Sequence, residues 1–543
     1  MNTKTQKYLL SIAPISFIWL IFNLSNYLWI KKNSAELIGD PAIHFFFSLL
    51  AYEGLKNPLL IISNPVAFIG YSFPYPPFFY YLISPFFILF GKCESTAMIV
   101  NGAISSLALF FAVYKTACLL HSKKSGIFAV FIIAFYPYVY TIYKDLFLEV
   151  FLTPLITLSI FFLLKSNYLN KTKYIIYFAI FLGLSFLTKF TAPAFISGVL
   201  LFIFINICSK WNKYSENMKK SLIRNLLLAM MIIITISAPW VIINKGKIIS
   251  GISSLTEMGV MLGYKNFTPA SNIYYFIALA DAITLPMFLF FFISLFFLTK
   301  HLRNLIFLWI ITPFIIFFFL FVKEVRYLLP IFPALAIATS IGINGMKSSF
   351  VRKFSCIFII VFLTASFITN TAVTPGQWKK YIPTYKWESG FKLRNDYDPI
   401  FLEFPRHFYY PAADYDRGTD KILDLISAHS TKGAKIYVGT GCTDIYPALL
   451  YKSKLRNLPN IFYLDRTGYI GSGLISEIDY IFLREGTYET YCSNEKFKKI
   501  IPGLEKLEKA EFIINPDKEN GIIGILIYKT QNNPAILSPD SPR

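Results

Sequence analysis

Between residues 8 and 371 the sequence repeatedly returns to apolar runs of about 20 residues, the length at which a helix crosses the hydrocarbon core of a bilayer. Backbone N–H and C=O groups find no water in hydrocarbon, so a chain that enters it must satisfy them within a helix or a closed barrel. Runs of this length indicate helices. We therefore predict an α-helical polytopic membrane protein.

About eleven apolar runs are long enough to be transmembrane helices. They lie at residues 8–30, 96–120, 126–143, 147–165, 173–189, 191–208, 222–243, 275–298, 304–322, 326–346 and 351–371. The apolar stretch 78–91 follows a proline-rich loop and is shorter than a span, so we expect a juxtamembrane or re-entrant helix there.

Lysine and arginine outnumber aspartate and glutamate by 52 to 31. We reject a nucleic-acid-binding function, because no basic stripe interleaved with aromatic residues occurs in the polar part of the chain. The basic residues cluster instead in alternate gaps between the apolar runs, at 121–124, 165–173, 209–220, 299–303 and 347–353. The positive-inside rule places these gaps and the N-terminus in the cytoplasm, and the C-terminus outside the plasma membrane.

The sequence changes character after residue 371. Strand candidates lie at 434–440, 460–465, 479–484 and 521–530, with helix-like stretches such as 419–429 and 443–453 between them. Strands that alternate with helices are typical of an α/β fold. We predict two domains, a transmembrane domain over 1–371 and an extracytoplasmic α/β domain over 372–543.

Acidic residues are scarce in the apolar part, so their positions are informative. The first outer loop contains GDPAIHF at residues 39–45. Pro41 suits the first position of a helix, which makes Asp40 a candidate N-cap with His44 one turn later on the same face. Asp40 has two explanations, a cap on a surface helix or a catalytic carboxylate with His44 beside it.

A second acidic site is YKDLFLEV, residues 143–150. Asp145 and Glu149 are four residues apart at the predicted outer end of a span. A carboxylate in a lipid-facing helix costs at least ~2.5 kcal/mol, so we expect Glu149 to face a polar cavity. A solvated helix end is the alternative, and it suits Asp145 better than Glu149.

Several cations lie at the same predicted outer side, against the insertion rule. Lys189 ends the motif GLSFLTK, and Arg326 and Tyr327 open RYLLPIFP. An anionic ligand would offset these charges, and pairing with Glu324 or another loop carboxylate is the alternative. Asp281, about two turns inside a predicted span, is a partner for such a cation or a part of the cavity.

The sequence contains no glycine-rich phosphate loop, CxxC pair, HExxH or GxSxG motif. It does resemble the GT-C superfamily of polyprenyl-phosphate-sugar-dependent glycosyltransferases, above all the protein O-mannosyltransferases and the lipid A aminoarabinose transferases. The matching pieces, in order, are GDPAIHF, YPPFFYYLISPFFILFG, the acidic second loop, GLSFLTK and RYLLPIFPALAIA. The resemblance does not extend into the C-terminal domain.

The resemblance implies that Asp40 is the general base for an acceptor hydroxyl that attacks the anomeric carbon with inversion. The leaving phosphate is a stable anion and needs no acid, unlike the leaving group of a glycosidase. It needs cations, for which Lys189 and Arg326 are candidates. Asp145 and Glu149 are the alternative bases. Tyr75 in the aromatic loop would guide the lipid or stack on the sugar, although an aromatic belt at the membrane interface explains it too.

Two departures from the family pattern concern the acceptor. Many members have Asp-Glu where this chain has Asp40-Pro41, and the WWD-type motif of oligosaccharyltransferases does not occur. Transfer of a preassembled oligosaccharide to asparagine is therefore disfavoured. We expect no cofactor: a divalent metal on His44, Asp40 and Asp145 or Glu149 is possible but is a weak ligand set, so His44 is expected to orient or tune Asp40.

The favoured hypothesis is an inverting transferase that moves one sugar from a polyprenyl-phosphate carrier to a lipid, glycan or protein acceptor outside the cytoplasm. A transporter or flippase of a lipid-linked sugar is the alternative. Transporters usually show repeated halves and charges near the midplane, whereas this chain shows no duplicated pattern and has its charges at the outer rim. A third hypothesis is a membrane-anchored binding module that acts through residues 372–543.

Overall fold

A computed structural model describes most of the helical part of the chain and separate segments of the C-terminal part. The described residues are 3–72, 74–261, 267–320, 322–371, 385–394, 397–404, 419–429, 435–438, 446–464, 480–486, 508–514 and 522–529. The chain divides into two compact units. The first comprises residues 1–30, 57–83 and 98–411, and the second comprises residues 31–56, 84–97 and 412–543. Each unit is described by itself.

Helices account for nearly all of the described residues before 371. They are α1 (Thr3–Lys32), α2 (Gly39–Lys56), α3 (Pro58–Ser63), α4 (Pro65–Gly70), α5 (Phe78–Phe90), α6 (Glu94–Leu120), α7 (Lys123–Ala134), α8 (Pro137–Ile142), α9 (Leu148–Lys165), α10 (Thr172–Phe186), α11 (Ala192–Cys208), η1 (Trp211–Lys213), α12 (Glu216–Met261), α13 (Pro269–Ile283), α14 (Leu285–Leu295), α15 (Lys300–Phe318), η2 (Val325–Ile331), α16 (Phe332–Asn344) and α17 (Ser349–Asn370).

The prediction of a helical multi-span membrane protein is confirmed. Within the described residues, seven helices are long and apolar enough to cross a membrane, or eight if the bent pair α13–α14 counts as one span. The prediction of eleven spans exceeds this number for two physical reasons. Pro137 divides the range 126–143 into α7 and α8, and the ranges 173–189 and 191–208 form the short helices α10 and α11.

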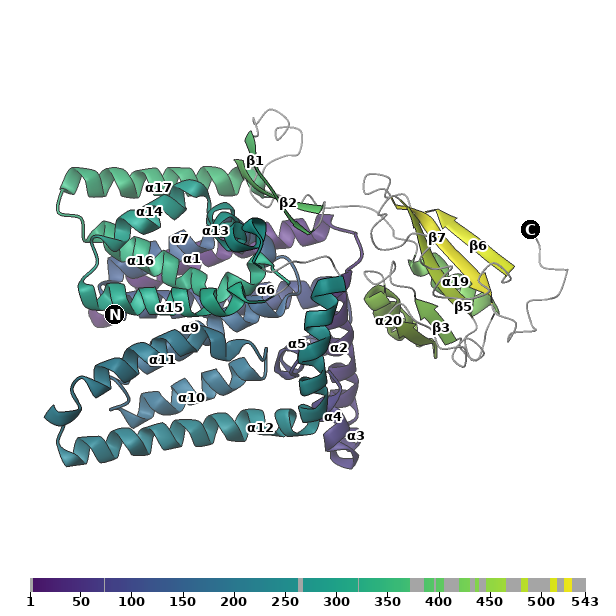
Figure 1. Ribbon diagram of the computed structural model, residues 1–543, viewed down its shortest axis with the longest axis horizontal. Helices are drawn as coiled ribbons and strands as arrows, with labels where there is room; N and C mark the ends of the chain where they lie inside the picture. Colours follow the sequence, from purple (N-terminus) through teal and green to yellow (C-terminus); the bar gives the residue numbers. More distant parts are fainter. Residues whose placement is uncertain are drawn as a thin grey trace. The chain divides into compact units, whose positions relative to one another are not determined.

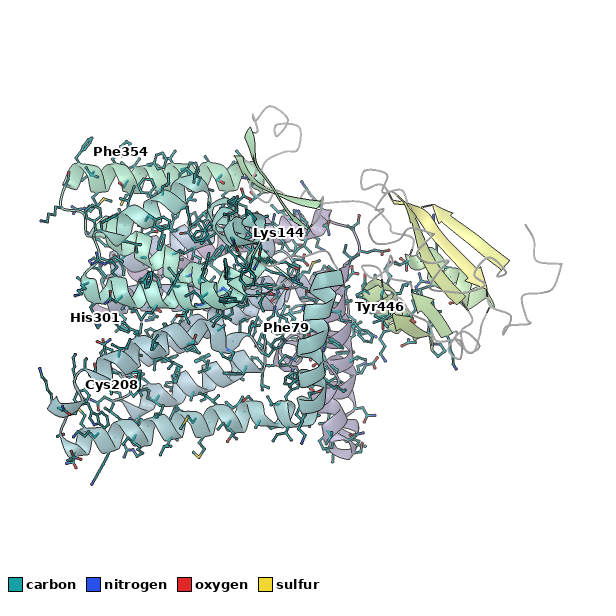
Figure 2. The ribbon with its side chains drawn as sticks, viewed as in Figure 1. Phe79, Lys144, Cys208, His301, Phe354 and Tyr446 are labelled. Atoms are coloured by element: carbon teal, nitrogen blue, oxygen red, sulfur yellow. The ribbon has the colours of Figure 1, made fainter. Side chains whose placement is uncertain are left out.

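The long helices of the first unit run side by side, as α9, α10, α11 and α12 do in Figure 1. Figure 2 shows Cys208 and His301 at one end of this bundle and Phe79 and Lys144 at the other. Cys208 directly precedes the basic gap 209–220, and His301 lies in the basic gap 299–303. Lys144 lies in the acidic second loop, residues 143–150. The two kinds of gap thus lie at opposite ends of the bundle, and which end faces the cytoplasm remains a prediction.

Hydrogen bonds between distant segments link the helices of this unit. Ser340 donates from its Oγ to the Ser125 carbonyl at 2.8 Å, and the Asn225 amide donates to the Leu169 carbonyl at 2.7 Å. Apolar packing alone does not drive helices together in lipid, where the surroundings are equally apolar, so polar bonds and close backbone contact hold such bundles.

Strands occur only after residue 384 among the described residues. An antiparallel pair joins β1 (Tyr385–Arg394) to β2 (Tyr397–Phe404). A second sheet has the order β4-β3-β5-β7-β6 and comprises β3 (Lys435–Val438), β4 (Ile461–Leu464), β5 (Tyr480–Gly486), β6 (Glu508–Ile514) and β7 (Ile522–Lys529). β3 is parallel to β4 and β5, whereas β7 is antiparallel to both of its neighbours.

The helices that accompany this sheet are α19 (Thr419–His429) and α20 (Tyr446–Leu455). Both coincide with the helix-like stretches predicted from the sequence, and β3, β4, β5 and β7 coincide with the four predicted strands. β1, β2 and β6 were not predicted. The assembly of these elements into an extracytoplasmic α/β domain, and the domain boundary after residue 371, remain predictions.

Gly198 in α11 marks the closest helix contact of the first unit and offers a test of the fold. A Cβ on Gly198 would lie 1.9 Å from the Leu308 carbonyl oxygen of α15. We expect Gly198→Ala to lower the free energy of unfolding by about 3 kcal/mol, because the two helices would have to separate. The melting temperature of the purified protein in detergent would reveal this loss.

The matched control is Gly246→Ala in α12, where no heavy atom lies within 4 Å of the added Cβ. Alanine is a better helix former than glycine, so the melting temperature of this variant should stay constant or rise. Equal melting temperatures for the two variants would contradict the packing of α11 on α15.

Candidate active site

Three charged side chains from distant parts of the first unit meet at the predicted outer end of the bundle. Glu149 lies in the first turn of α9, and Lys189 follows the end of α10. The Lys189 Nζ lies 2.5 Å from the Glu149 Oε1, and the Arg326 Nε of η2 lies 3.9 Å from the same oxygen. All three side chains are buried, with the Glu149 side chain only 3% exposed. One carboxylate thus serves two cations.

Arg326 also contacts a second carboxylate. Its Nη2 donates to the Glu324 Oε1 at 3.0 Å, and the Glu324 side chain is 40% exposed. With Lys189 and Glu149 the four side chains have no net charge. The two glutamates differ in kind: Glu149 is enclosed between the cations, whereas Glu324 approaches Arg326 from the solvent side.

Aromatic rings surround the two cations. Lys189 lies over the ring of Tyr327 at 5.0 Å, and Arg326 lies over Phe147 at 4.6 Å. Tyr327 stacks in turn on Phe317 of α15. These rings hold the cationic side chains in fixed positions and attract their charge electrostatically. The sequence predicted a role for Tyr327 but gave no signal for Phe147, whose ring lies beside the site because the chain turns just before α9.

The predicted aromatic loop packs against the elements that carry this cluster. The Phe78 amide donates to the carbonyl of Leu187, two residues before Lys189, at 3.0 Å. The rings of Phe78 and Phe79 lie 5.8 and 6.1 Å from that of Phe151 in α9. Tyr75 opens this loop in a turn with Ser72 and is partly buried. The loop and the charged cluster therefore share one scaffold.

Asp145 lies outside the described cluster. α9 begins at Leu148, and residues 143–147 form a turn, so the four-residue spacing from Asp145 to Glu149 is not helical. The Asp145 Oδ1 accepts from the Leu146 amide at 2.7 Å, and the Asn101 side chain donates to the Asp145 carbonyl. The sequence alternative in which Asp145 occupies a helix end is thus corrected to a structured turn that precedes the helix.

Asp281 lies beside a sharp break in the chain. α13 and α14 meet at an angle of 103°, and Thr284 between them has a φ of +77°. A positive φ is rare for a β-branched residue and marks a strained backbone. Asp281 is buried, and its carbonyl accepts from the Thr284 amide at 3.2 Å. A broken helix within membrane depth is tolerated where its backbone is covered by protein or lines a cavity.

Lys323 forms a further cationic position, just before η2. Its Nζ donates to the carbonyls of Phe318 and Leu320 at 2.7 and 2.9 Å, at the C-terminal end of α15. Burial lowers the pKa of Lys323 to about 8. Since the carbonyls at a helix C-terminus attract cations, this lysine has a structural explanation as a cap.

Asp40 and His44 belong to α2 in the second unit. The helix begins at Gly39, whose φ is +56°, so Asp40 lies in the first turn rather than at the predicted cap position. Asp40 is partly buried and His44 is 2% exposed. The His44 carbonyl accepts from the Ser48 hydroxyl at 2.8 Å. The two side chains lie one helical turn apart, as the spacing predicts.

A search for metal-binding groups finds no cluster of three or more His, Cys, Asp or Glu side chains within the residues that the structure describes. The chemistry available at the Glu149 cluster is electrostatic. Two buried cations, held by rings and by one carboxylate, can stabilise the negative charge of a phosphate.

Part of the chain matches a known protein family. Residues 75–243 match the family described as dolichyl-phosphate-mannose-protein mannosyltransferase. This segment contains the aromatic loop, Glu149 and Lys189. None of the curated proteins matches the sequence.

Solved structures show the same fold at low sequence identity. The apo structure of ArnT from Cupriavidus metallidurans is 12% identical, with a TM-score of 0.55 and all of both chains covered. The oligosaccharyltransferase of Archaeoglobus fulgidus, tethered to an acceptor peptide with the NVT sequon, is 11% identical, with a TM-score of 0.53 over 97% of this chain and 75% of that one. The ArnT structure bound to undecaprenyl phosphate is 14% identical, with a TM-score of 0.48 over 67% and 71% of the two chains.

The fold resembles that of ArnT. The resemblance inferred from the ordered motifs is confirmed by the family match over residues 75–243. Over residues 75–243 the chain is thus similar to the dolichyl-phosphate-mannose-protein mannosyltransferases, and its fold is similar to that of ArnT.

Proposed function

We propose that the protein transfers one sugar from a polyprenyl phosphate to a hydroxyl of a lipid, glycan or protein acceptor outside the cytoplasm, with inversion at the anomeric carbon. The observation that carries this proposal is the buried cluster of Lys189, Arg326 and Glu149. Arg326 pairs with Glu324, whose side chain is 40% exposed, so a phosphate on the donor could take the place of this carboxylate. ArnT of Cupriavidus metallidurans has been solved with undecaprenyl phosphate bound.

In the proposed reaction the acceptor oxygen forms a bond to the anomeric carbon while the bond from that carbon to the phosphate oxygen breaks. The acceptor proton passes to the carboxylate of Asp40, and the electron pair of the broken bond stays on the phosphate. Lys189 and Arg326 would stabilise this charge as it develops, which is the role that fixed cations perform best in a site closed to water. Tyr75 and Tyr327 would contact the lipid or the sugar, and His44 would orient Asp40.

The two glutamates beside the cations would have different roles. Glu149 is enclosed and holds Lys189 and Arg326 in position. Glu324 is partly exposed and contacts Arg326 from the solvent side. We propose that Glu324 occupies the position of the donor phosphate when the site is empty, and that the phosphate displaces it on binding.

The proposed topology places the charged cluster and the C-terminal end of the chain outside the cytoplasm. The basic gaps at 121–124, 165–173, 209–220, 299–303 and 347–353 support this orientation, since the positive-inside rule assigns them to the cytoplasm. The sheet of β3 to β7 with α19 and α20 supports an α/β domain within 372–543. Asp281 would line the cavity at the break between α13 and α14.

The first test of this function is Asp40→Asn. We expect at least a hundredfold lower turnover of a polyprenyl-phosphate monosaccharide, because an amide cannot accept the acceptor proton. Release of free polyprenyl phosphate from a panel of such donors, supplied with membrane acceptors, is measured by mass spectrometry. Glu216→Gln, where the side chain is 75% exposed, is the matched control and should keep wild-type turnover.

Full turnover by Asp40→Asn would move the base to Asp145 or Glu149 and keep the enzyme class. If no donor were consumed, yet donors crossed the bilayer of proteoliposomes, the transfer reaction and its site would both be wrong.

The second test separates the two glutamates. We expect Glu324→Gln to lower the KM for the donor about fivefold, because the phosphate no longer competes with a carboxylate for Arg326. Glu149→Gln should instead lower the free energy of unfolding by about 3 kcal/mol, because it leaves buried cations without their partner. Donor kinetics and thermal melting in detergent measure these effects.

The control for this pair of variants is Glu216→Gln in the exposed pair of Glu216 with Lys219, where the Glu216 side chain is 75% exposed. Its removal should change stability by about 0.5 kcal/mol or less. A donor KM that rises in Glu324→Gln would contradict the displacement of Glu324 by phosphate.

A further inference from the structure

Within the second unit, helix α20 packs directly on α2, the helix that carries Asp40. Figure 1 shows the two helices beside one another. The ring of Tyr451 in α20 meets that of Phe45 in α2 edge to face at 5.2 Å, and Phe45 also contacts Phe87 at 5.8 Å. Tyr451 and Phe45 are fully buried. This apolar contact fixes how the two helices pack on one another.

Ion pairs fasten the segment that leads into α2. The Lys452 Nζ lies 2.5 Å from the Glu36 Oε1 and 2.7 Å from the Asp420 Oδ2 of α19. The buried hydroxyl of Thr419 donates to the same Glu36 oxygen at 2.6 Å. The side chains of Glu36 and Lys452 are 7% and 13% exposed, so solvent screens their attraction only weakly.

A second ion pair holds the other end of α2. The Lys454 Nζ lies 2.6 Å from the Glu53 Oε2, and both side chains are about one third exposed or more. Inside the C-terminal segment, Arg456 joins α20 to α19 through Asp420 and Asp424. Thus α19 braces α20, and α20 presents Lys452 and Lys454 to α2 and to the segment before it.

These contacts lie on both sides of a glycine turn. Gly39 has a φ of +56°, a conformation that glycine adopts at little cost and through which the chain turns into α2. Glu36 is held three residues before it, and Phe45 and Glu53 are held after it. Asp40 is the residue next to Gly39, so its position depends on whether both sides of the turn are fixed.

The geometry points to Lys452 as a positioning residue: the α19–α20 segment clamps the two sides of the Gly39 turn and thereby holds the carboxylate of Asp40 in place for transfer. This inference rests on the proposed role of Asp40 as the base. It makes the C-terminal segment a working part of the transferase rather than a separate binding module.

Burial opposes the charge of Lys452, but its hydrogen bonds to Asp420 and Glu36 hold the pKa of this lysine above its ordinary value. The clamp therefore stays charged at neutral pH. The contacts are intramolecular, and one cation faces two carboxylates, so its removal takes from Glu36 and Asp420 the positive charge that they share.

The experiment uses the full-length protein with Lys452→Met, which keeps the length of the side chain and removes its charge. Hydrogen exchange is measured over residues 33–56, and donor turnover is measured on the same samples. We expect amides 36–45 to exchange at least tenfold faster and kcat to fall at least tenfold. The KM for the donor should stay within twofold, because the donor cations Lys189 and Arg326 are not altered. Lys452→Arg should restore both quantities.

The matched control is Lys421→Met on α19, an exposed lysine whose loss should change neither quantity. If Lys452→Met does not fold, Lys454→Gln provides the milder test, with faster exchange confined to the residues around Glu53. Unchanged exchange and unchanged kcat in a folded Lys452→Met variant would overturn the inference, and so would a fall in kcat that Lys452→Arg does not restore.

Failure of the clamp and failure of the proposed base are distinguishable. If Asp40→Asn keeps full turnover while Lys452→Met speeds the exchange of α2, the docking of α20 stands and the base is wrong. If Asp40→Asn abolishes turnover while Lys452→Met changes neither exchange nor kcat, the base stands and the clamp is wrong.

Discussion

Glu149 places a full negative charge in the first turn of a helix long and apolar enough to span the membrane. Such a charge is tolerated only when cations accompany it, because neither lipid nor the apolar interior can solvate it. Two cations accompany it. Lys189, 40 residues farther along the chain, comes from the end of α10, and Arg326 comes from η2, later still in the chain. The arrangement of three helix ends therefore depends on one carboxylate, and so does the site that they form.

The inability of hydrocarbon to solvate polar groups also explains why much of the fold was predictable. Hydrocarbon permits helices, and each predicted span corresponds to helical segments of the described structure. The count of spans failed where local geometry overrules apolar length. Pro137 ends the hydrogen-bond pattern between α7 and α8, and the strained Thr284 bends the chain between α13 and α14. Neither the strain nor the bend angle has a signature in hydropathy.

The sequence singled out the charges of the candidate site but not the contacts between distant segments. Glu149, Lys189 and Arg326 stand out because charged residues are rare and costly in apolar sequence, and the structure brings these three together. Phe147 has no such signal, because aromatic residues are common throughout the chain. Glu36 and Lys452 lie 416 residues apart in ordinary polar surroundings, so nothing in the sequence links them.

The fixed cations and the movable base of the proposed reaction tolerate different errors in position. In the proposed reaction Lys189 and Arg326 would act at a distance through their charge, so small displacements would change their effect little. A base must lie within hydrogen-bond reach of the proton that it accepts, and an error of 1 Å can cost about a hundredfold in rate. The proposed base follows a glycine turn, which by itself would leave its position loose. A clamp on both sides of that turn would fix the position of Asp40, which α2 by itself would leave loose. The C-terminal segment would then contribute to the transfer reaction.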